Sequence, residues 1–133
     1  KEEVLELVSL EKDVLNKFPS QLSGGQIQRV VIAIALSRDI KLLLLDEPTT
    51  ALDDENKNNI IDLISEIKER LKILILFVTH DINSIKDICQ NIIILKNGKI
   101  IEEGLTNEIL SAPKEDYTKR LINSTFRNKN FRT

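Results

Sequence analysis

The sequence is poor in cysteine, with Cys89 alone among its 133 residues. A single cysteine excludes an internal disulfide and a metal site built from cysteines, because each needs further thiols. This usage fits a reducing compartment such as the cytoplasm. We expect Cys89 to be a buried thiol.

Long hydrophobic runs are also missing. The longest are Val30 to Leu36 and Ile73 to Val78, whereas a membrane-spanning helix needs about 20 apolar residues. Neither run predicts a membrane helix. We expect both to lie in the interior of a folded domain.

An excess of basic charge is missing too. The 19 Lys and Arg residues stand against 21 Asp and Glu residues, which gives a formal net charge of -2. Proteins that bind nucleic acid usually concentrate basic charge on one face. The sequence therefore gives no reason to expect a nucleic-acid partner.

The middle of the sequence predicts two parallel strands joined by a helix. Lys41 to Leu45 and Ile73 to Val78 are aliphatic without polar alternation, which is typical of strands covered on both faces. Asp53 to Arg70 has apolar residues at helical spacing, acidic residues at its start and basic residues at its end. Strands joined in this way run parallel. We therefore expect an α/β fold.

Charged side chains follow these two strands. Asp46 and Glu47 come directly after the first strand, and His80 follows the second. Because open α/β sheets bind ligands at the carboxyl ends of their strands, we expect these residues at one edge of the sheet. A lone histidine is more often structural, and Asp46 by itself could merely cap a loop.

The first part of the sequence predicts two short helices and one long one. Glu2 to Leu10 and the region of Val14 and Leu15 have near-helical apolar spacing, and Pro19 ends the second of these. A longer helix is expected from Ile27 to Leu36. Because it is apolar almost all round, we expect it to be buried between layers.

The last third predicts short elements around a hairpin turn at Asn97-Gly98. Thr106 is expected to cap a helix, and Gly104 to end the strand before it. Too few apolar residues follow Thr125 for us to expect an ordered tail. The expected elements are a helix from Asp81 to Cys89, strands Ile92 to Leu95 and Lys99 to Ile101, and helices Thr106 to Leu110 and Tyr117 to Asn123.

A polar turn before the long helix predicts an anion site. Ser23 is a good N-cap residue, and Gly24 and Gly25 leave backbone N–H groups without Cβ atoms beside them. Such amides at a helix start attract phosphate. Taken alone, this pattern is more often a plain helix cap.

Further motifs change that interpretation. Leu42-Leu43-Leu44-Leu45-Asp46-Glu47-Pro48 follows the Leu22-Ser23-Gly24-Gly25-Gln26 turn, and Thr50-Ala51-Leu52-Asp53 and Phe77-Val78-Thr79-His80-Asp81 come next. In this order they resemble the signature loop, Walker B strand, D-loop and H-loop of an ABC (ATP-binding cassette) transporter ATPase. The resemblance covers nearly the whole chain. It implies the α/β fold of a P-loop NTPase (RecA-like) with a mainly parallel sheet.

The resemblance implies a role for each motif. Asp46 is expected to hold Mg²⁺ through water, and Glu47 to activate the water that attacks the γ-phosphate of ATP. His80 is expected to contact that phosphate, and Asp53 to reach across a dimer interface. The signature loop is expected to bind ATP held by a second ATP-binding subunit; its residues are Ser23, Gly24, Gly25 and Gln26.

Two parts of the family pattern do not occur in this sequence. There is no G-x-x-x-x-G-K-[ST] phosphate loop and no glutamine loop, and the first residue is Lys1 rather than methionine. We expect a C-terminal portion of one nucleotide-binding domain, with a helical and signature region at 1–38. The core from Walker B to the H-loop is expected at 39–112, and a C-terminal helix and tail at 113–133.

The resemblance also implies partners and a location. We expect a homo- or heterodimer of ATP-binding subunits, membrane permease subunits, and indirectly an extracellular or periplasmic substrate-binding protein. The chain would lie at the cytoplasmic face of the membrane. The segments Lys96 to Gly104 and Tyr117 to Leu121, with Pro113 between them, resemble importers of peptides or nickel chelates.

Two alternatives remain open from the sequence. One is an ABC-type ATPase of DNA repair or translation, although no coiled coil or basic arm is visible in this segment. The other concerns the isolated chain, which would lack enzyme activity without a phosphate loop.

Overall fold

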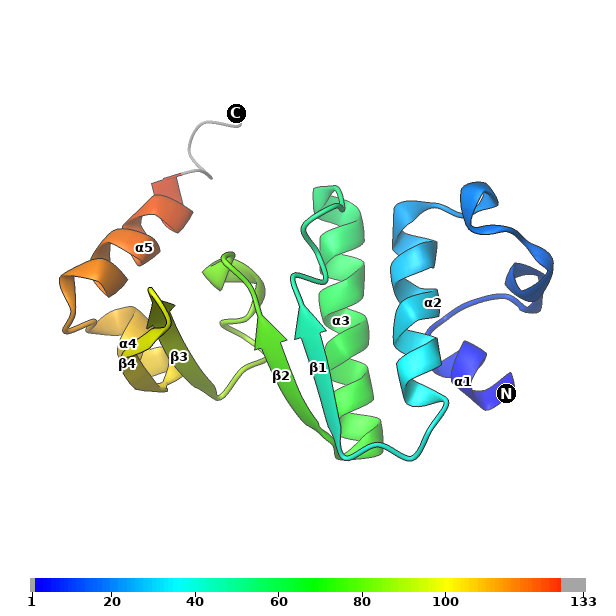
Figure 1. Cartoon of the computed structure of the whole chain (residues 1–133), viewed down its shortest axis with the longest axis horizontal. Coiled ribbons are helices and arrows are strands. Elements are labelled where there is room, and N and C mark those ends of the chain that lie inside the picture. Colours follow the sequence, from blue (N-terminus) through cyan, green and yellow to red (C-terminus); the bar gives the residue numbers. More distant parts are fainter. Residues whose placement is uncertain (1, 128–133) are drawn as a thin grey trace. The chain divides into compact units, whose positions relative to one another are not determined.

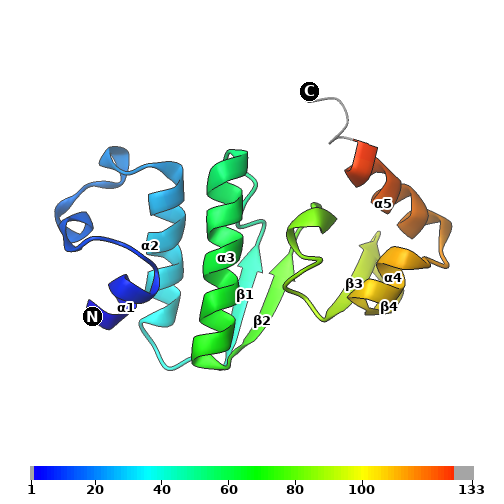
Figure 2. The same cartoon turned by 180° about the vertical axis from the view of Figure 1, so that it is seen from behind.

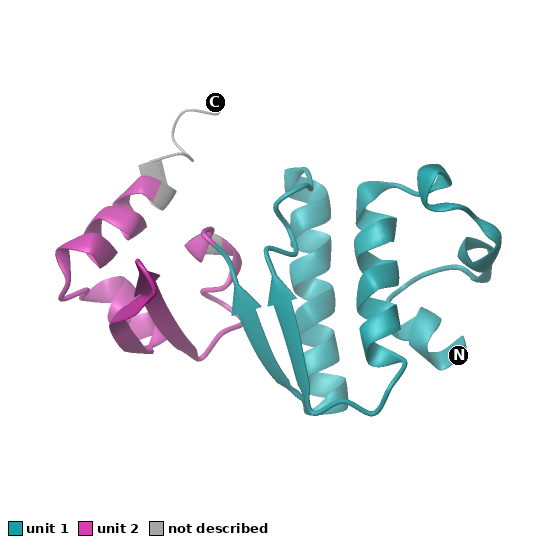
Figure 3. Ribbon diagram, in the orientation of Figure 1, with its two compact units in different colours: residues 1–79 teal, residues 80–133 magenta. Residues whose placement is uncertain are grey.

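A computed structural model describes residues 2–127 of the chain. The chain forms two compact units, which divide between Thr79 and His80 (Figure 3).

The first unit begins with short helices. The helix α1 spans Glu2–Leu7, and two 3-10 helices follow at Lys12–Asn16 and Pro19–Gln21. The expected helix from Glu2 to Leu10 is therefore too long, because Ser9 adopts a left-handed conformation with φ of 53°. Leu10 is nevertheless buried, so the apolar spacing correctly marked core residues.

The long helix α2 spans Gly24–Leu36 and lies beside α3 (Figure 1). Ile32, Ala33 and Leu36 are buried, whereas Val31 is 53% and Ile34 66% exposed. The expectation of a helix buried all round is therefore wrong. Within the first unit α2 packs mainly against α1 and α3, and Val31 and Ile34 stay exposed.

The central part forms the strand, helix and strand that the sequence predicts. Strand β1, Leu42–Asp46, pairs in parallel with β2, Leu74–Val78, from Leu42 opposite Leu74 to Asp46 opposite Val78. The helix α3, Asp54–Leu71, connects them and covers one face of this two-stranded sheet (Figure 2). This unit confirms the α/β fold class.

The two faces of this sheet differ in exposure. Leu43 and Leu45 are buried on the face toward α3, at 4% and 6% exposure. The other face stays exposed, so the expectation of strands covered on both faces is wrong for the described chain. No other element of the first unit lies over it. We call it the open sheet face; its residues are Leu42, Leu44, Leu74, Leu76 and Val78.

The second unit is built on an antiparallel hairpin. Strand β3, Asn91–Lys96, pairs with β4, Lys99–Leu105, through the Asn97-Gly98 turn. Both turn residues have positive φ, 51° and 74°, which is typical of a type I′ hairpin turn. The predicted turn is confirmed, and it accounts for the antiparallel pairing.

Several predicted boundaries in this unit are wrong. Only Ile82–Ser84, a 3-10 helix, forms within the expected helix from Asp81 to Cys89. Gly104 does not end β4, because its φ of 159° is extended enough for the strand to continue. Leu105 occupies the N-cap position of α4, Thr106–Ser111, and Thr106 instead donates its N–H to the Gln90 carbonyl. Cys89 is half-buried rather than buried.

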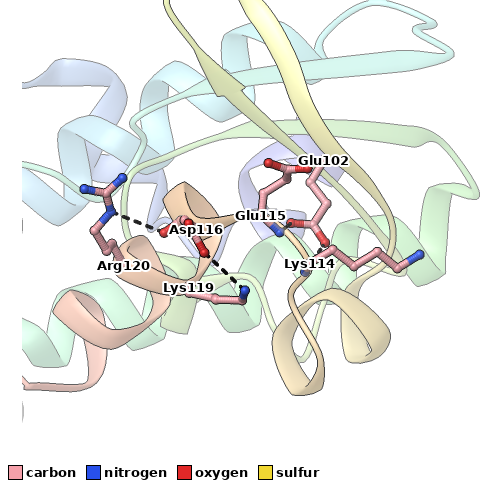
Figure 4. Close-up of polar contacts among 6 residues, drawn as sticks. All are labelled: Glu102, Lys114, Glu115, Asp116, Lys119 and Arg120. Carbon is pink, nitrogen blue, oxygen red and sulfur yellow. Dashed lines mark hydrogen bonds and ion pairs between the residues drawn. The ribbon is translucent and has the colours of Figure 1, made fainter.

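The helix α5 spans Asp116–Arg127 and includes the predicted segment. Residues 128–133 of the expected tail lie outside the described residues. Glu102 of β4 accepts hydrogen bonds from the N–H groups of Lys114 and Glu115, at 2.9 and 3.2 Å, just before α5 begins (Figure 4). Since Glu102 is only 9% exposed, its carboxylate joins the hairpin firmly to the start of α5.

Candidate functional site

The acidic pair lies at the carboxyl end of β1. Asp46 is the last strand residue, and the N–H of Glu47 donates to the Val78 carbonyl at 2.8 Å. Glu47 has a φ of 47°, a conformation that residues other than glycine rarely adopt. Such strain occurs often at functional sites. Here it makes the chain turn sharply as it leaves the sheet.

The residues after Glu47 form a tight series of turns. The Thr50 N–H donates to the Glu47 carbonyl at 3.2 Å, and the Thr50 hydroxyl donates to Glu47 Oε2 at 2.6 Å. Thr49 is 2% exposed and anchors the middle of this loop. The Glu47 carboxylate is therefore held by its own loop.

Asp53 ends this loop as the N-cap of α3. Its Oδ1 accepts the backbone N–H of Asn56 at 2.9 Å, and its Oδ2 accepts the side-chain amide of the same residue at 2.8 Å. The Asn56 N–H, followed by the Asn56 amide, holds the pKa of Asp53 below its ordinary value. Asp53 is therefore the N-cap residue of α3.

The signature turn forms a reciprocal cap at the start of α2. Ser23 Oγ accepts the Gln26 N–H at 3.2 Å, and Gln26 Oε1 accepts the Ser23 N–H at 3.0 Å. This capping box satisfies two backbone donors. The amides of Gly24 and Gly25 are also in the first turn, where the helix itself offers no acceptor. Ser23 and Gly24 are exposed, whereas Gly25 is buried, so an anion could reach the turn at its Ser23-Gly24 end.

Within one chain the signature turn packs against the D-loop end of α3. A Cβ on Gly25 would lie 2.7 Å from Asn56 Oδ1, and one on Gly24 would lie 3.4 Å from Leu52. Residues that sequence reasoning assigned to two separate motifs are therefore neighbours.

His80 is exposed and is the first residue of the second unit. It comes two positions after Val78, the residue that pairs with Asp46. The predicted meeting of His80 with the acidic pair stays a prediction.

Comparisons with known proteins show what the chain is similar to in sequence and in fold. Residues 2–50 match the ABC transporter family. A dimeric structure of a post-hydrolysis state of the ATP-binding cassette MJ0796, bound to ADP and Pi, superposes with a TM-score of 0.67. The two are 39% identical, and the match covers 78% of this chain and 44% of that one. The chain is therefore similar, in sequence and in fold, to part of an ABC transporter ATP-binding cassette.

Two relatives of known function are similar to this chain in sequence. The chain is 46% identical over 120 residues to the methionine import ATP-binding protein MetN of Bacillus subtilis (strain 168), covering 90% of the chain and 35% of the relative. MetN of Helicobacter acinonychis (strain Sheeba) is also 46% identical, with 90% and 36% covered. The chain thus spans about a third of the length of these relatives. They do not support the predicted resemblance to peptide or nickel importers.

The donor set of this ABC ATPase fold suits Mg²⁺ held jointly with a nucleotide. Among residues 2–127, no three His, Cys, Asp or Glu side chains gather into a group that could hold a metal alone. Mg²⁺ is usually bound by one or two carboxylates together with water and substrate phosphates. Asp46, exposed at the end of β1, fits that single-carboxylate role.

No helix in the described part of the chain is both long and apolar enough to cross a bilayer.

Sequence reasoning missed two residues of this region. Thr50 was assigned only to the D-loop, although its spacing of three residues from Glu47 suits a turn that returns a hydroxyl to the carboxylate. Asn56 follows Asp53 by three residues, which is the spacing of an N-cap contact. Neither spacing shows by itself that Asn56 also touches Gly25.

Proposed function

We propose that this chain supplies the signature loop, the acidic pair and the D-loop of an ATP-hydrolysing subunit that powers import across a membrane. The supporting observation is the strained Glu47 beside Asp46 at the strand end, with its carboxylate oriented by Thr50. The relatives are import ATP-binding proteins, and a similar solved structure holds ADP and Pi.

In this proposal Glu47 accepts the proton of the water that attacks the γ-phosphate. General-base assistance of this kind contributes about 10² to 10⁴ in rate. Thr50 holds Oε2 by a hydrogen bond and so restricts the orientation of the carboxylate that is proposed to accept the proton. Mg²⁺, held in part by Asp46, would neutralise charge on the phosphates. His80 is proposed to contact the γ-phosphate as charge develops there.

The signature turn is proposed to act on a second subunit. Its glycine amides, its helix dipole and the Ser23 hydroxyl would bind the terminal phosphate of an ATP that the partner holds. ATP would then form part of the interface of a homo- or heterodimer. Hydrolysis would weaken that interface and transmit motion to membrane permease subunits. The subunit would lie at the cytoplasmic face and receive cargo indirectly from a substrate-binding protein.

For the cargo, we propose an amino acid such as methionine. The support is the name of the relatives, which are 46% identical over 90% of the chain. Peptides and nickel chelates, which the C-terminal segments had suggested, are less well supported. A cassette of this kind does not touch the cargo, so residues in this chain carry little information about it.

The test is Glu47→Gln in the full-length gene product. We expect ATP hydrolysis to fall at least about 100-fold while ATP-dependent dimers still form. Glu55→Gln, a change at an exposed carboxylate in the first turn of α3, is the matched control and is expected to keep turnover. Glu47→Gln turnover within about threefold of the unchanged protein would refute the assigned role.

A further inference from the structure

Gly25 lies unusually close to a side chain of the neighbouring helix. It is buried at the start of α2, and a Cβ there would meet Asn56 Oδ1 at 2.7 Å and Asn56 Cγ at 3.3 Å. The first distance is shorter than real Cβ contacts allow. Alanine at position 25 would therefore displace the side-chain amide of Asn56.

The same side chain is fixed at its other end by Asp53. Asn56 Nδ2 donates to Asp53 Oδ2 at 2.8 Å, and the Asn56 backbone N–H donates to Asp53 Oδ1 at 2.9 Å. The amide nitrogen is thus held by the D-loop, and its oxygen is turned toward Gly25. The hydrogen bond from Nδ2 restrains rotation of the side-chain amide away from α2.

We propose that Asn56 is a positioning residue that couples the signature turn to the D-loop within one chain. This inference rests on the proposed function, in which both elements face the partner subunit. A displacement of Asp53 changes the orientation of the Asn56 amide, and that amide borders the turn that presents Ser23. The two motifs then move as one body when the dimer closes.

A double-mutant experiment tests the contact. All variants are made in the full-length protein carrying Glu47→Gln. The ATP concentration at half-maximal dimerisation is measured for Gly25→Ala, for Asn56→Ala and for the double variant, called the pair. We expect Gly25→Ala to raise it at least about tenfold, and Asn56→Ala to raise it about threefold. The pair should match Asn56→Ala alone, because the remaining Asn56 Cβ lies at an ordinary 3.8 Å from the added methyl.

The alternative explanation gives the opposite result. If Gly25 is needed only so that phosphate can approach its amide, the added methyl blocks the partner's ATP whatever stands at position 56. The pair is then at least as weak as Gly25→Ala, and the proposal is overturned. Asn59→Ala, at an exposed asparagine one turn along α3, is the control and should not rescue Gly25→Ala.

Two readouts separate positioning from misfolding and from failure of the proposed function. A folding defect lowers the amount of dimer at saturating ATP, whereas lost positioning shifts the midpoint. The melting temperature, measured without ATP, tests the contact independently of dimerisation. We expect Gly25→Ala to lower Tm and the added Asn56→Ala to restore it. If Glu47→Gln alone forms no ATP-dependent dimers, the proposed function fails while Tm still tests the contact. Absence of Tm rescue overturns the coupling itself.

Discussion

The hydroxyl of Thr50 donates a 2.6 Å hydrogen bond to Oε2 of Glu47. This bond closes a loop that begins at Glu47, whose backbone lies in the left-handed region. The buried Thr49 anchors the middle of the loop. A general base works only when its carboxylate is held within hydrogen-bonding reach of the water it activates. The hydrogen bond from Thr50 restricts the orientation of this carboxylate.

Thr50→Val removes the donor and keeps the shape of the side chain. We expect kcat of the full-length protein to fall about 10- to 100-fold, because a loosely held base loses its alignment with the water. ATP binding should change by less than about threefold, since Thr50 is not among the proposed phosphate contacts. Thr50→Ser retains a hydroxyl and should keep most of the rate. Steady-state ATPase kinetics and equilibrium ATP binding check both statements, and a Val variant with normal kcat would contradict them.

Ser23→Gly separates the capping and ATP roles of the signature turn. Glycine at an N-cap costs only a few tenths of a kcal/mol relative to serine, whereas alanine costs about 1 kcal/mol. We therefore expect Ser23→Gly to leave the free energy of unfolding nearly unchanged and to weaken ATP-dependent dimerisation at least about tenfold through loss of the hydroxyl. Urea unfolding and light scattering measure the two effects. Unchanged dimerisation would argue for a purely structural serine.

Adjacent leucines in β1 should differ sharply in their contribution to stability. In the chain of residues 1–133, Leu43→Ala should cost about 2 to 5 kcal/mol, because Leu43 is 4% exposed. Leu44 is 59% exposed, and its replacement by alanine should cost less than about 0.5 kcal/mol. Urea unfolding followed by circular dichroism gives both values. Equal costs would show that the open sheet face is covered in solution.

Glu102 should make stability depend on pH. The N–H of Lys114, first among its partners, holds the pKa of Glu102 below its ordinary value of 4.5. A carboxylate with a lowered folded pKa contributes stability above its unfolded value, and this is lost as pH falls through the folded value. The difference in Tm between the unchanged protein and Glu102→Gln should therefore be present at pH 7 and shrink below pH 4.5.

Hydrogen exchange gives an independent measure of the same contact. At pH 7 we expect Glu102→Gln to speed exchange of the Lys114 and Glu115 amides by about tenfold, because a neutral acceptor holds them less strongly. Glu103 is exposed on the same strand, so Glu103→Gln should change neither exchange nor the pH profile. Equal effects of the two substitutions would rule out a specific role for Glu102.

The sequence predicted those features that depend on residues close together in the chain. The strand, helix and strand around α3, the Asn97-Gly98 turn and the Ser23 cap all depend on spacing or backbone preference within a few residues. The segment from Asp81 to Cys89 was predicted as a helix because its apolar residues have helical spacing. It folds as a 3-10 helix and turns instead, so spacing over so short a segment was insufficient.

Burial and long-range contacts were harder to predict. The aliphatic runs correctly marked strands and a helix, but a run of leucines does not show which face has a partner in the chain. The packing around Gly25 was not predicted either. The sequence explained this glycine only by the approach of a phosphate to its amide. Its contact with Asn56 joins residues 31 positions apart (56 minus 25), and such a contact depends on how α2 and α3 pack.

The open sheet face has a consequence for the handling of the protein. Five aliphatic side chains lie exposed on two short strands, and each strand has one edge without a partner in its sheet. Exposed apolar edges of this kind add strands from other molecules and lead to aggregation. Residues 1–133 produced alone should therefore need low concentration, a chaperone or a mild detergent to remain in solution, and crystallisation trials should begin from a longer polypeptide.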